Sequence, residues 1–210
     1  MGSRFTEDDF GITHLASLFH QDWRMSGSAR DVVVDYVGQT SAPYAVALAE
    51  DALRLMASGA AGTVETLWEC ITGSNYRLDV NEVNGLDWVR EIAVICEASL
   101  RGAGLPASRE VGESLYGGLT ERVVAEIDEI GPALVETIER NSWKGIPSAT
   151  SELRKCATEI CPELAFRIFL RVLMEYSFNI NRRQYVRFVE LGHEFSYGDF
   201  VVSRTEFLIQ

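Results

Sequence analysis

The sequence predicts an all-α protein, a helical bundle built from two packed helical subdomains. Apolar residues recur at steps of three and four through most of the 210 residues, which is the period of a helix with one buried face. Residues that favour helix caps stand just before several of these stretches, and glycine or proline ends them. Only Tyr76, Leu78 and Val80 alternate, and they suggest one short extended piece.

The first expected helix begins at Thr6, whose hydroxyl is a suitable cap for a first turn that holds the acids of residues 7–9. Its expected buried residues are Phe10, Ile12, Leu15, Leu18 and Phe19. Residues 22–27 read as a connection. Ser28 and Asp31 then have the spacing of a capping box, which favours a helix, although the valines that follow leave a strand open.

Three further helices are expected before residue 101. One begins at Ser41, with a proline in its first turn, and ends near Gly59; the others cover residues 63–71 and 86–100. Residues 101–108 hold two glycines and a proline, and the charge balance changes there. They predict a boundary between an acidic helical domain, 1–101, and a second helical domain or extension, 109–210.

The second half is predicted to be helical as well. A short helix is expected at 111–116, and Thr120 is a suitable cap for a helix that Gly131-Pro132 interrupts or kinks before it resumes at residue 133. A polar helix follows at 148–157. The most buried helix is expected at 163–178, where glutamates four residues from two arginines predict ion pairs. A capping box at residues 181–184 begins another helix, and 200–209 is an apolar end segment, helix or edge strand.

The charge of the chain is acidic and unevenly distributed along the sequence. Residues 1–100 carry 15 acids and 6 bases, a net charge of −9, whereas residues 101–210 carry 16 acids and 13 bases, a net charge of −3. A negative field repels nucleic acid and anionic membranes, and it attracts a basic protein such as a nuclease. The acidity also serves solubility. An acidic N-terminus without a signal-peptide pattern predicts a cytoplasmic protein.

No residue pattern predicts catalysis, a cofactor or a metal site. The histidines His14, His20 and His193 lack metal-ligand spacing, and motifs for nucleotide binding or a nucleophile elbow are missing from the sequence. The four cysteines, Cys70, Cys96, Cys156 and Cys161, are expected to be buried thiols in a reducing cytosol. Arg182, Arg183 and Arg187 form a basic group that we interpret as a solvated helix face.

One short motif points to a family. Residues 19–23 read Phe-His-Gln-Asp-Trp and resemble the F-x-Q-D-W signature near the start of immunity proteins from bacterial contact-dependent growth inhibition systems. The resemblance covers about residues 10–101 and continues through the helices after Ser28 and Ser41 to Gly85-Leu86-Asp87-Trp88-Val89. Val89 replaces the commoner leucine, and about a hundred residues follow that resemble, weakly, the tails of other toxin-immunity proteins.

The resemblance implies an antitoxin that binds and blocks the C-terminal toxin domain of a contact-dependent growth inhibition effector and catalyses nothing. Its expected partner is that toxin domain, a basic nuclease, rather than nucleic acid, a membrane or a small-molecule substrate. The candidate partner-binding residues are the acids Asp22, Asp31, Asp35, Asp79, Glu82, Asp87 and Glu91. We interpret Phe19 and Trp23 as core residues. The alternatives are a small helical metal-dependent hydrolase that uses a histidine, or a helical regulatory module that binds a basic protein.

Overall fold

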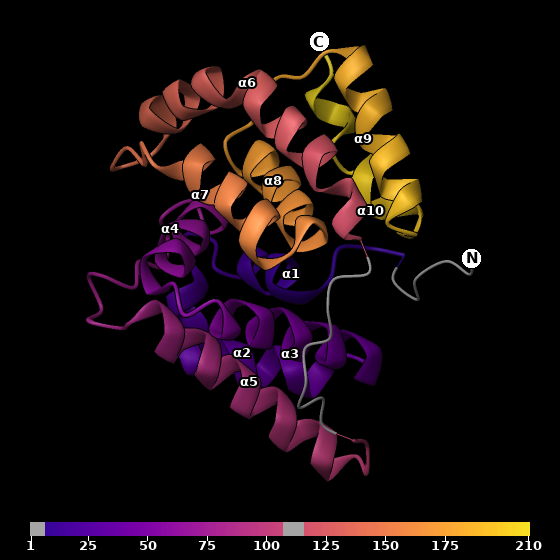
Figure 1. The fold of residues 1–210 in the computed structure, drawn as a ribbon. Helices are drawn as coiled ribbons and strands as arrows, with labels where there is room; N and C mark the ends of the chain where they lie inside the picture. Colours follow the sequence, from indigo (N-terminus) through magenta and orange to yellow (C-terminus); the bar gives the residue numbers. More distant parts are fainter. Residues whose placement is uncertain (1–6, 107–115) are drawn as a thin grey trace. The chain divides into compact units, whose positions relative to one another are not determined.

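The computed structural model describes residues 7–106 and 116–210, and the all-α prediction is confirmed. These residues form helices without a strand, apart from one isolated parallel bridge between Ile180 and Ile209. They divide into two compact units. Residues 10–106 form the N-terminal unit, and residues 7–9 together with 116–210 form the C-terminal unit; Figure 1 colours the first from indigo to magenta and ends the second in yellow.

Five α-helices and one 3₁₀ turn form the described part of the N-terminal unit. They are α1 (Gly11–Ser17), η1 (Trp23–Ser26), α2 (Ala29–Gln39), α3 (Ala42–Ala57), α4 (Ala61–Ile71) and α5 (Gly85–Gly102). Helix α3 packs along α5, and α1 packs against α3. The predicted helices at 63–71 and 86–100 are therefore present, and the residues 101 and 102 of the expected linker form the last turn of α5.

The start of the first helix differs from the expectation. Residues 7–9 precede α1, which begins at Gly11, and Thr6 lies outside the described residues. Gly11 has a φ of +64°, a backbone conformation that favours glycine. The N–H of Ile12 donates to Oδ2 of buried Asp51 at 2.9 Å. A carboxylate from α3 thus accepts a hydrogen bond from a free N–H group at the start of α1, a role that was expected for the local cap Thr6.

The acids before α1 belong to the other unit. The N–H of Phe200 donates to the carbonyl of Glu7 at 2.8 Å, and Arg204 lies 3.7 Å from a carboxylate oxygen of Asp9. These contacts tie residues 7–9 to the C-terminal end of the chain. The charge difference between the two halves of the sequence is therefore absent between the two units, because the acids at residues 7–9 belong to the C-terminal unit.

A cluster of five aromatic side chains fills one end of the N-terminal unit. Its members are Phe19, Trp23, Trp68, Tyr76 and Trp88, each at most 5% exposed. The ring centroid of Phe19 lies 5.2 Å from Trp68 and 5.2 Å from Tyr76, and Trp68 and Trp88 meet edge to face at 5.3 Å. Burying rings of this size is the largest packing contribution that single residues make to a core. The cluster joins the turn after α1 to α4 and α5.

The described part of the C-terminal unit contains five α-helices and three other helical turns. They are η2 (Gly117–Leu119), α6 (Thr120–Asn141), α7 (Ala149–Lys155), the π-helical turn η3 (Cys156–Ile160), α8 (Pro162–Glu175), α9 (Arg182–Glu194), α10 (Asp199–Ser203) and η4 (Glu206–Leu208). The capping box that was predicted at Asn181 and Gln184 is present at the start of α9. Of the short helix expected at 111–116, residues 111–115 lie outside the described residues.

Helix α6 was predicted to be interrupted or kinked at Gly131-Pro132, and the interruption is absent. The helix continues through Pro132 and is 22 residues long. Its buried stripe runs along both sides of the proline, with Val123, Ile127, Ile130, Leu134 and Ile138 at helical spacing. Packing of that stripe outweighs the lost backbone hydrogen bond. A Cβ at Gly131 would lie 3.4 Å from the methyl group of Thr150, an ordinary van der Waals contact, so this part of α6 lies beside α7.

Charged side chains lie inside the core of the C-terminal unit. The side chain of Arg167 is fully buried, and its Nε lies 2.7 Å from Oε1 of Glu163, one helical turn earlier in α8. The hydroxyl of Tyr197 donates to the carbonyl of Glu163 at 3.2 Å. Arg171 and Glu175 pair in the same way at 2.5 Å. Both predicted ion pairs of this helix are therefore present, and one of them is a core element.

Candidate protein-binding site

The five residues of the family-like motif divide between the core and the surface. Phe19 and Trp23 belong to the aromatic cluster, and the indole Nε1 of Trp23 donates to the carbonyl of Asn75 at 2.9 Å. His20, Gln21 and Asp22 are exposed. The interpretation of Phe19 and Trp23 as core residues is therefore confirmed. The motif fixes the turn after α1 through its two aromatic ends, and it presents its polar middle to solvent.

Local hydrogen bonds hold the exposed part of this turn. The N–H of Asp22 donates to Nδ1 of His20 at 3.2 Å, and the N–H of Met25 donates to the carbonyl of Asp22 at 2.9 Å. With Nδ1 as the acceptor, a neutral His20 carries its proton on Nε2. Gly27 ends the turn at a φ of +111°, where a Cβ would lie 2.8 Å from Oδ2 of Asp31. The next helix begins at once, with the capping box expected there.

A cleft of about 400 Å³ is lined by residues of this turn, of α1 and of α2. Leu18 and Val32 supply its aliphatic wall, and the rings of His14, His20 and Tyr36 line it as well. Its remaining lining residues are polar, namely Ser26, Asp35, Gln39 and Thr40. The hydroxyl of Tyr36 lies 3.4 Å from Nδ1 of His14, which connects α1 with α2 across the cleft.

Three of the seven candidate acids keep their carboxylates free of ion pairs within the described residues. Asp22 lies in the turn, Asp35 lines the cleft, and Glu82 lies in the connection between α4 and α5. All three are exposed, and no described arginine or lysine lies within 4.0 Å of their carboxylate oxygens. A free, exposed carboxylate can pair with a cation of another protein without first losing an internal partner.

The other four acids have partners inside their own unit. Asp31 accepts the hydroxyl of Ser28 at 2.7 Å and its N–H at 2.8 Å, and these bonds lower the pKa of Asp31. Asp87 pairs with Arg90 in α5, and Glu91 lies 3.2 Å from Arg30 of α2. Asp31 caps α2, and Glu91 joins α5 to α2. These acids therefore stabilise the fold of their own unit.

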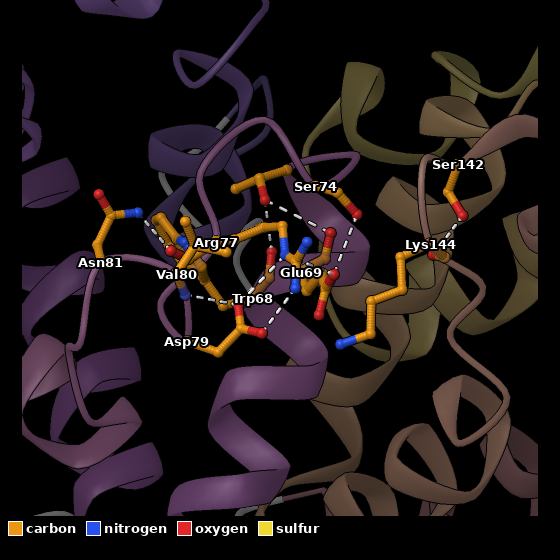
Figure 2. Close-up of polar contacts among 10 residues, drawn as sticks. Trp68, Glu69, Ser74, Arg77, Asp79, Val80, Asn81, Ser142 and Lys144 are labelled. Atoms are coloured by element: carbon orange, nitrogen blue, oxygen red, sulfur yellow. Dashed lines mark hydrogen bonds and ion pairs between the residues drawn. The ribbon is translucent and has the colours of Figure 1, made fainter.

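Asp79, the fourth, organises the connection between α4 and α5 (Figure 2). The guanidinium of Arg77 reaches both its oxygens, with Nη2 at 2.6 Å from Oδ2 and Nε at 3.2 Å from Oδ1. Oδ1 also accepts the N–H of Val80 at 2.8 Å. Arg77 lies 3.5 Å from Glu69 as well, and Asn81 donates to the carbonyl of Arg77 at 2.5 Å.

The prediction of a short extended segment at residues 76–80 is wrong. The connection is a series of turns, and the N–H groups of Asn81 and Val83 both donate to the carbonyl of Leu78. Tyr76 and Leu78 are buried, which accounts for two of the three alternating residues. Val80 is 65% exposed and does not continue the pattern. Buried side chains in a compact turn can repeat every second residue without any strand pairing.

The cleft itself was not predicted, although the residues that form it carry a recognisable pattern. His14 of α1 is four residues from Leu18, the C-cap residue of that helix, and Asp35 and Gln39 are four apart on α2. Each pair therefore lies on one helix face. That these faces meet depends on the turn at residues 19–27, whose geometry has no regular sequence period. His14 and His20 are six residues apart and would not share a face of one helix, and the turn brings both of them to the cleft.

The groups considered for metal or thiol chemistry are separated or buried. All four cysteines are free thiols in the interior, and burial raises the pKa of Cys96 to about 12. His193 lines a smaller pocket of about 160 Å³ in the C-terminal unit, whereas His14 and His20 belong to the N-terminal unit. Among residues 7–106 and 116–210, no three His, Cys, Asp or Glu side chains are grouped closely enough to hold a metal ion.

Comparisons of the chain with protein-family models, with curated proteins and with solved structures found no match. None of the helices in the described ranges has both the length and the apolar character that crossing a membrane requires.

Proposed function

We propose that this protein is an immunity protein, an antitoxin that binds the C-terminal toxin domain of a contact-dependent growth inhibition effector and blocks it by occlusion in the cytoplasm. The observation that carries the proposal is the division of the motif at residues 19–23. Its aromatic ends build the core, and His20 of its polar middle lines a cleft together with Asp35, whose carboxylate has no ion-pair partner among the described residues. A motif that builds the core beside a cleft with an exposed carboxylate suits a protein that acts by binding.

The charge of the N-terminal unit supports a basic partner. Its described residues hold 12 acids and 6 bases, a net charge of −6. Such a field speeds the encounter with a basic protein and weakens as the ionic strength rises. A toxin that cleaves nucleic acid carries a basic surface to hold its substrate. An acidic inhibitor that covers this surface would exclude the substrate without any chemistry of its own.

The test is direct binding to the toxin domain encoded beside the gene for this chain. We expect the purified full chain to form a stable complex with that domain, to abolish its nuclease activity at a 1:1 ratio, and to restore growth of cells that express it. A dissociation constant in the nanomolar range corresponds to about −12 kcal/mol. Absence of a complex, together with absence of protection in cells, would contradict the proposal.

A further inference from the structure

We propose that the cleft between the turn at residues 19–27 and α2 receives an arginine side chain of the partner protein, an inference that rests on the proposed function and specifies where recognition occurs. A volume of about 400 Å³ lies within the range of pockets that hold small ligands or side-chain head groups. The partner would insert one side chain there while its remaining surface contacts the exposed polar residues around the cleft.

The chemistry of the lining favours a cation. Asp35 supplies a carboxylate without an ion-pair partner among the described residues, and Gln39 and Thr40 add oxygen acceptors one helical turn further along α2. A guanidinium presents five N–H donors in a plane and pairs with a carboxylate through two of them. A lysine ammonium would use the same charge, but it matches several separated acceptors less well.

The walls fit the rest of an arginine side chain. Leu18 and Val32 form an aliphatic surface that suits the methylene stem. The rings of Tyr36 and His14 also line the cleft and meet edge to face, with centroids 5.2 Å apart, and aromatic rings attract a guanidinium. The cleft thus combines aliphatic side chains, aromatic rings and a carboxylate, each of which can contact part of an arginine side chain.

The two imidazoles also admit the opposite reading, an anion site. Two observations oppose it. The carboxylate of Asp35 belongs to the same lining, so an anion would meet a negative charge at close range. The described residues of the unit also carry a net charge of −6, which lowers the local concentration of anions. A neutral apolar ligand is disfavoured as well, because only two of the lining residues are aliphatic.

The experiment uses N-acetyl-L-arginine amide as a probe and follows backbone amide signals of the full chain by two-dimensional NMR. We expect signals of the cleft residues to shift and to saturate in the millimolar range, because one side chain provides only about −4 kcal/mol or less. The citrulline analogue, which has the same shape without the charge, should leave these signals unchanged. Asp35→Asn should weaken arginine binding at least fivefold.

Asp22→Asn is the matched control, because Asp22 is exposed in the same turn but does not line the cleft. It should leave binding of the arginine probe within twofold of the unmodified protein. Equal shifts with the citrulline analogue, an unchanged affinity in Asp35→Asn, or shifts confined to other residues would overturn the inference. If the arginine probe binds as expected and the toxin domain does not, the cleft assignment stands and the proposed function fails. If the toxin domain binds and the arginine probe does not, the proposed function stands and the cleft assignment fails.

Discussion

The two units carry the same net charge and use it differently. The described part of the N-terminal unit holds 12 acids and 6 bases, and that of the C-terminal unit holds 17 acids and 11 bases, so both have a net charge of −6. The N-terminal unit builds its core from aromatic rings and leaves free carboxylates on its surface. The C-terminal unit takes charged groups into its interior. Net charge alone therefore does not show which unit faces a partner.

Arginines of the C-terminal unit join its helices. Arg187 on α9 contacts Glu126 on α6 at 2.6 Å and Glu129 at 2.6 Å, and these bonds raise the pKa of Arg187 above its usual range. The basic group that includes Arg187 was interpreted as a solvated helix face, and for this residue the interpretation is wrong. Arg182, by contrast, is exposed, 3.8 Å from Glu206. Arg187 therefore joins α9 to α6 instead of remaining a free surface cation.

The cysteines make the comparison measurable, because each unit has two of them. Cys70 and Cys96 belong to the N-terminal unit, and Cys156 and Cys161 belong to the C-terminal unit. All four are buried, and the raised pKa of Cys96 keeps its thiol protonated at neutral pH. A thiol reagent should therefore react only after a unit opens. Mass spectrometry of the labelled peptides along a urea series then gives a separate stability for each unit.

The largest expected effect is that of Trp23→Ala on the N-terminal unit. The substitution removes a side chain that is 5% exposed and the hydrogen bond from Trp23 to Asn75, and we expect a loss of about 4–5 kcal/mol. Labelling of Cys70 and Cys96 should shift to lower urea. Trp23→Phe is the control, since it keeps most of the buried ring and should cost less than half as much. A stable Trp23→Ala variant that no longer binds the toxin would show that Trp23 serves the interface instead.

Next in size is Arg167→Met in the C-terminal unit. The methionine fills most of the space, but it leaves Glu163 buried without its cation, which costs about 3 kcal/mol. Cys156 and Cys161 should react at lower urea, while Cys70 and Cys96 keep their profile. The double variant with Glu163→Gln should recover part of the loss, because the remaining polar group is neutral. Equal shifts at all four cysteines would contradict the picture of two separate units.

How much the sequence could predict differs between the helices and the connections. Ser28 and Asn181 begin helices where their capping patterns indicated, since a cap depends only on residues three or four apart. The start of α1 depends instead on Asp51, 39 positions from Ile12, and no local pattern reveals such a partner. The continuity of α6 through Pro132 was missed for the same reason, because the packing that keeps the helix intact comes from other helices.

The candidate site was predictable only in part. The motif at residues 19–23 was recognised and its aromatic ends were placed in the core, which the burial of Phe19 and Trp23 confirms. Charge alone selected seven acids without distinguishing them. Their neighbours decide which carboxylates are free, as for Asp79, which Arg77 and the backbone of Val80 engage. The cleft was not predictable, because its shape depends on the backbone path of the turn at residues 19–27.

A smaller effect is expected from Gly27→Ala, which tests the turn that shapes the cleft. Alanine would be strained at a φ of +111°, and its Cβ would lie 2.8 Å from the carboxylate of Asp31, so we expect a loss of about 1–2 kcal/mol from the N-terminal unit. Gly38→Ala is the matched control within the same unit. Its Cβ would meet no atom within 4 Å, and alanine favours the helix by about 0.5–1 kcal/mol. A harmless Gly27→Ala would refute this role of the turn.

The most direct test of the central claim compares two sets of charge removals. One variant replaces the free acids of the N-terminal unit, as Asp22→Asn, Asp35→Asn and Glu82→Gln; the other makes the same change of charge in the C-terminal unit, at exposed acids, as Glu121→Gln, Glu139→Gln and Glu190→Gln. Affinity for the toxin domain should fall about tenfold or more for the first set, mainly through lost charge pairing, and its salt dependence should flatten. The second set should change affinity less than about threefold. Equal losses, or a larger loss from the second set, would contradict the assignment of toxin binding to the N-terminal unit.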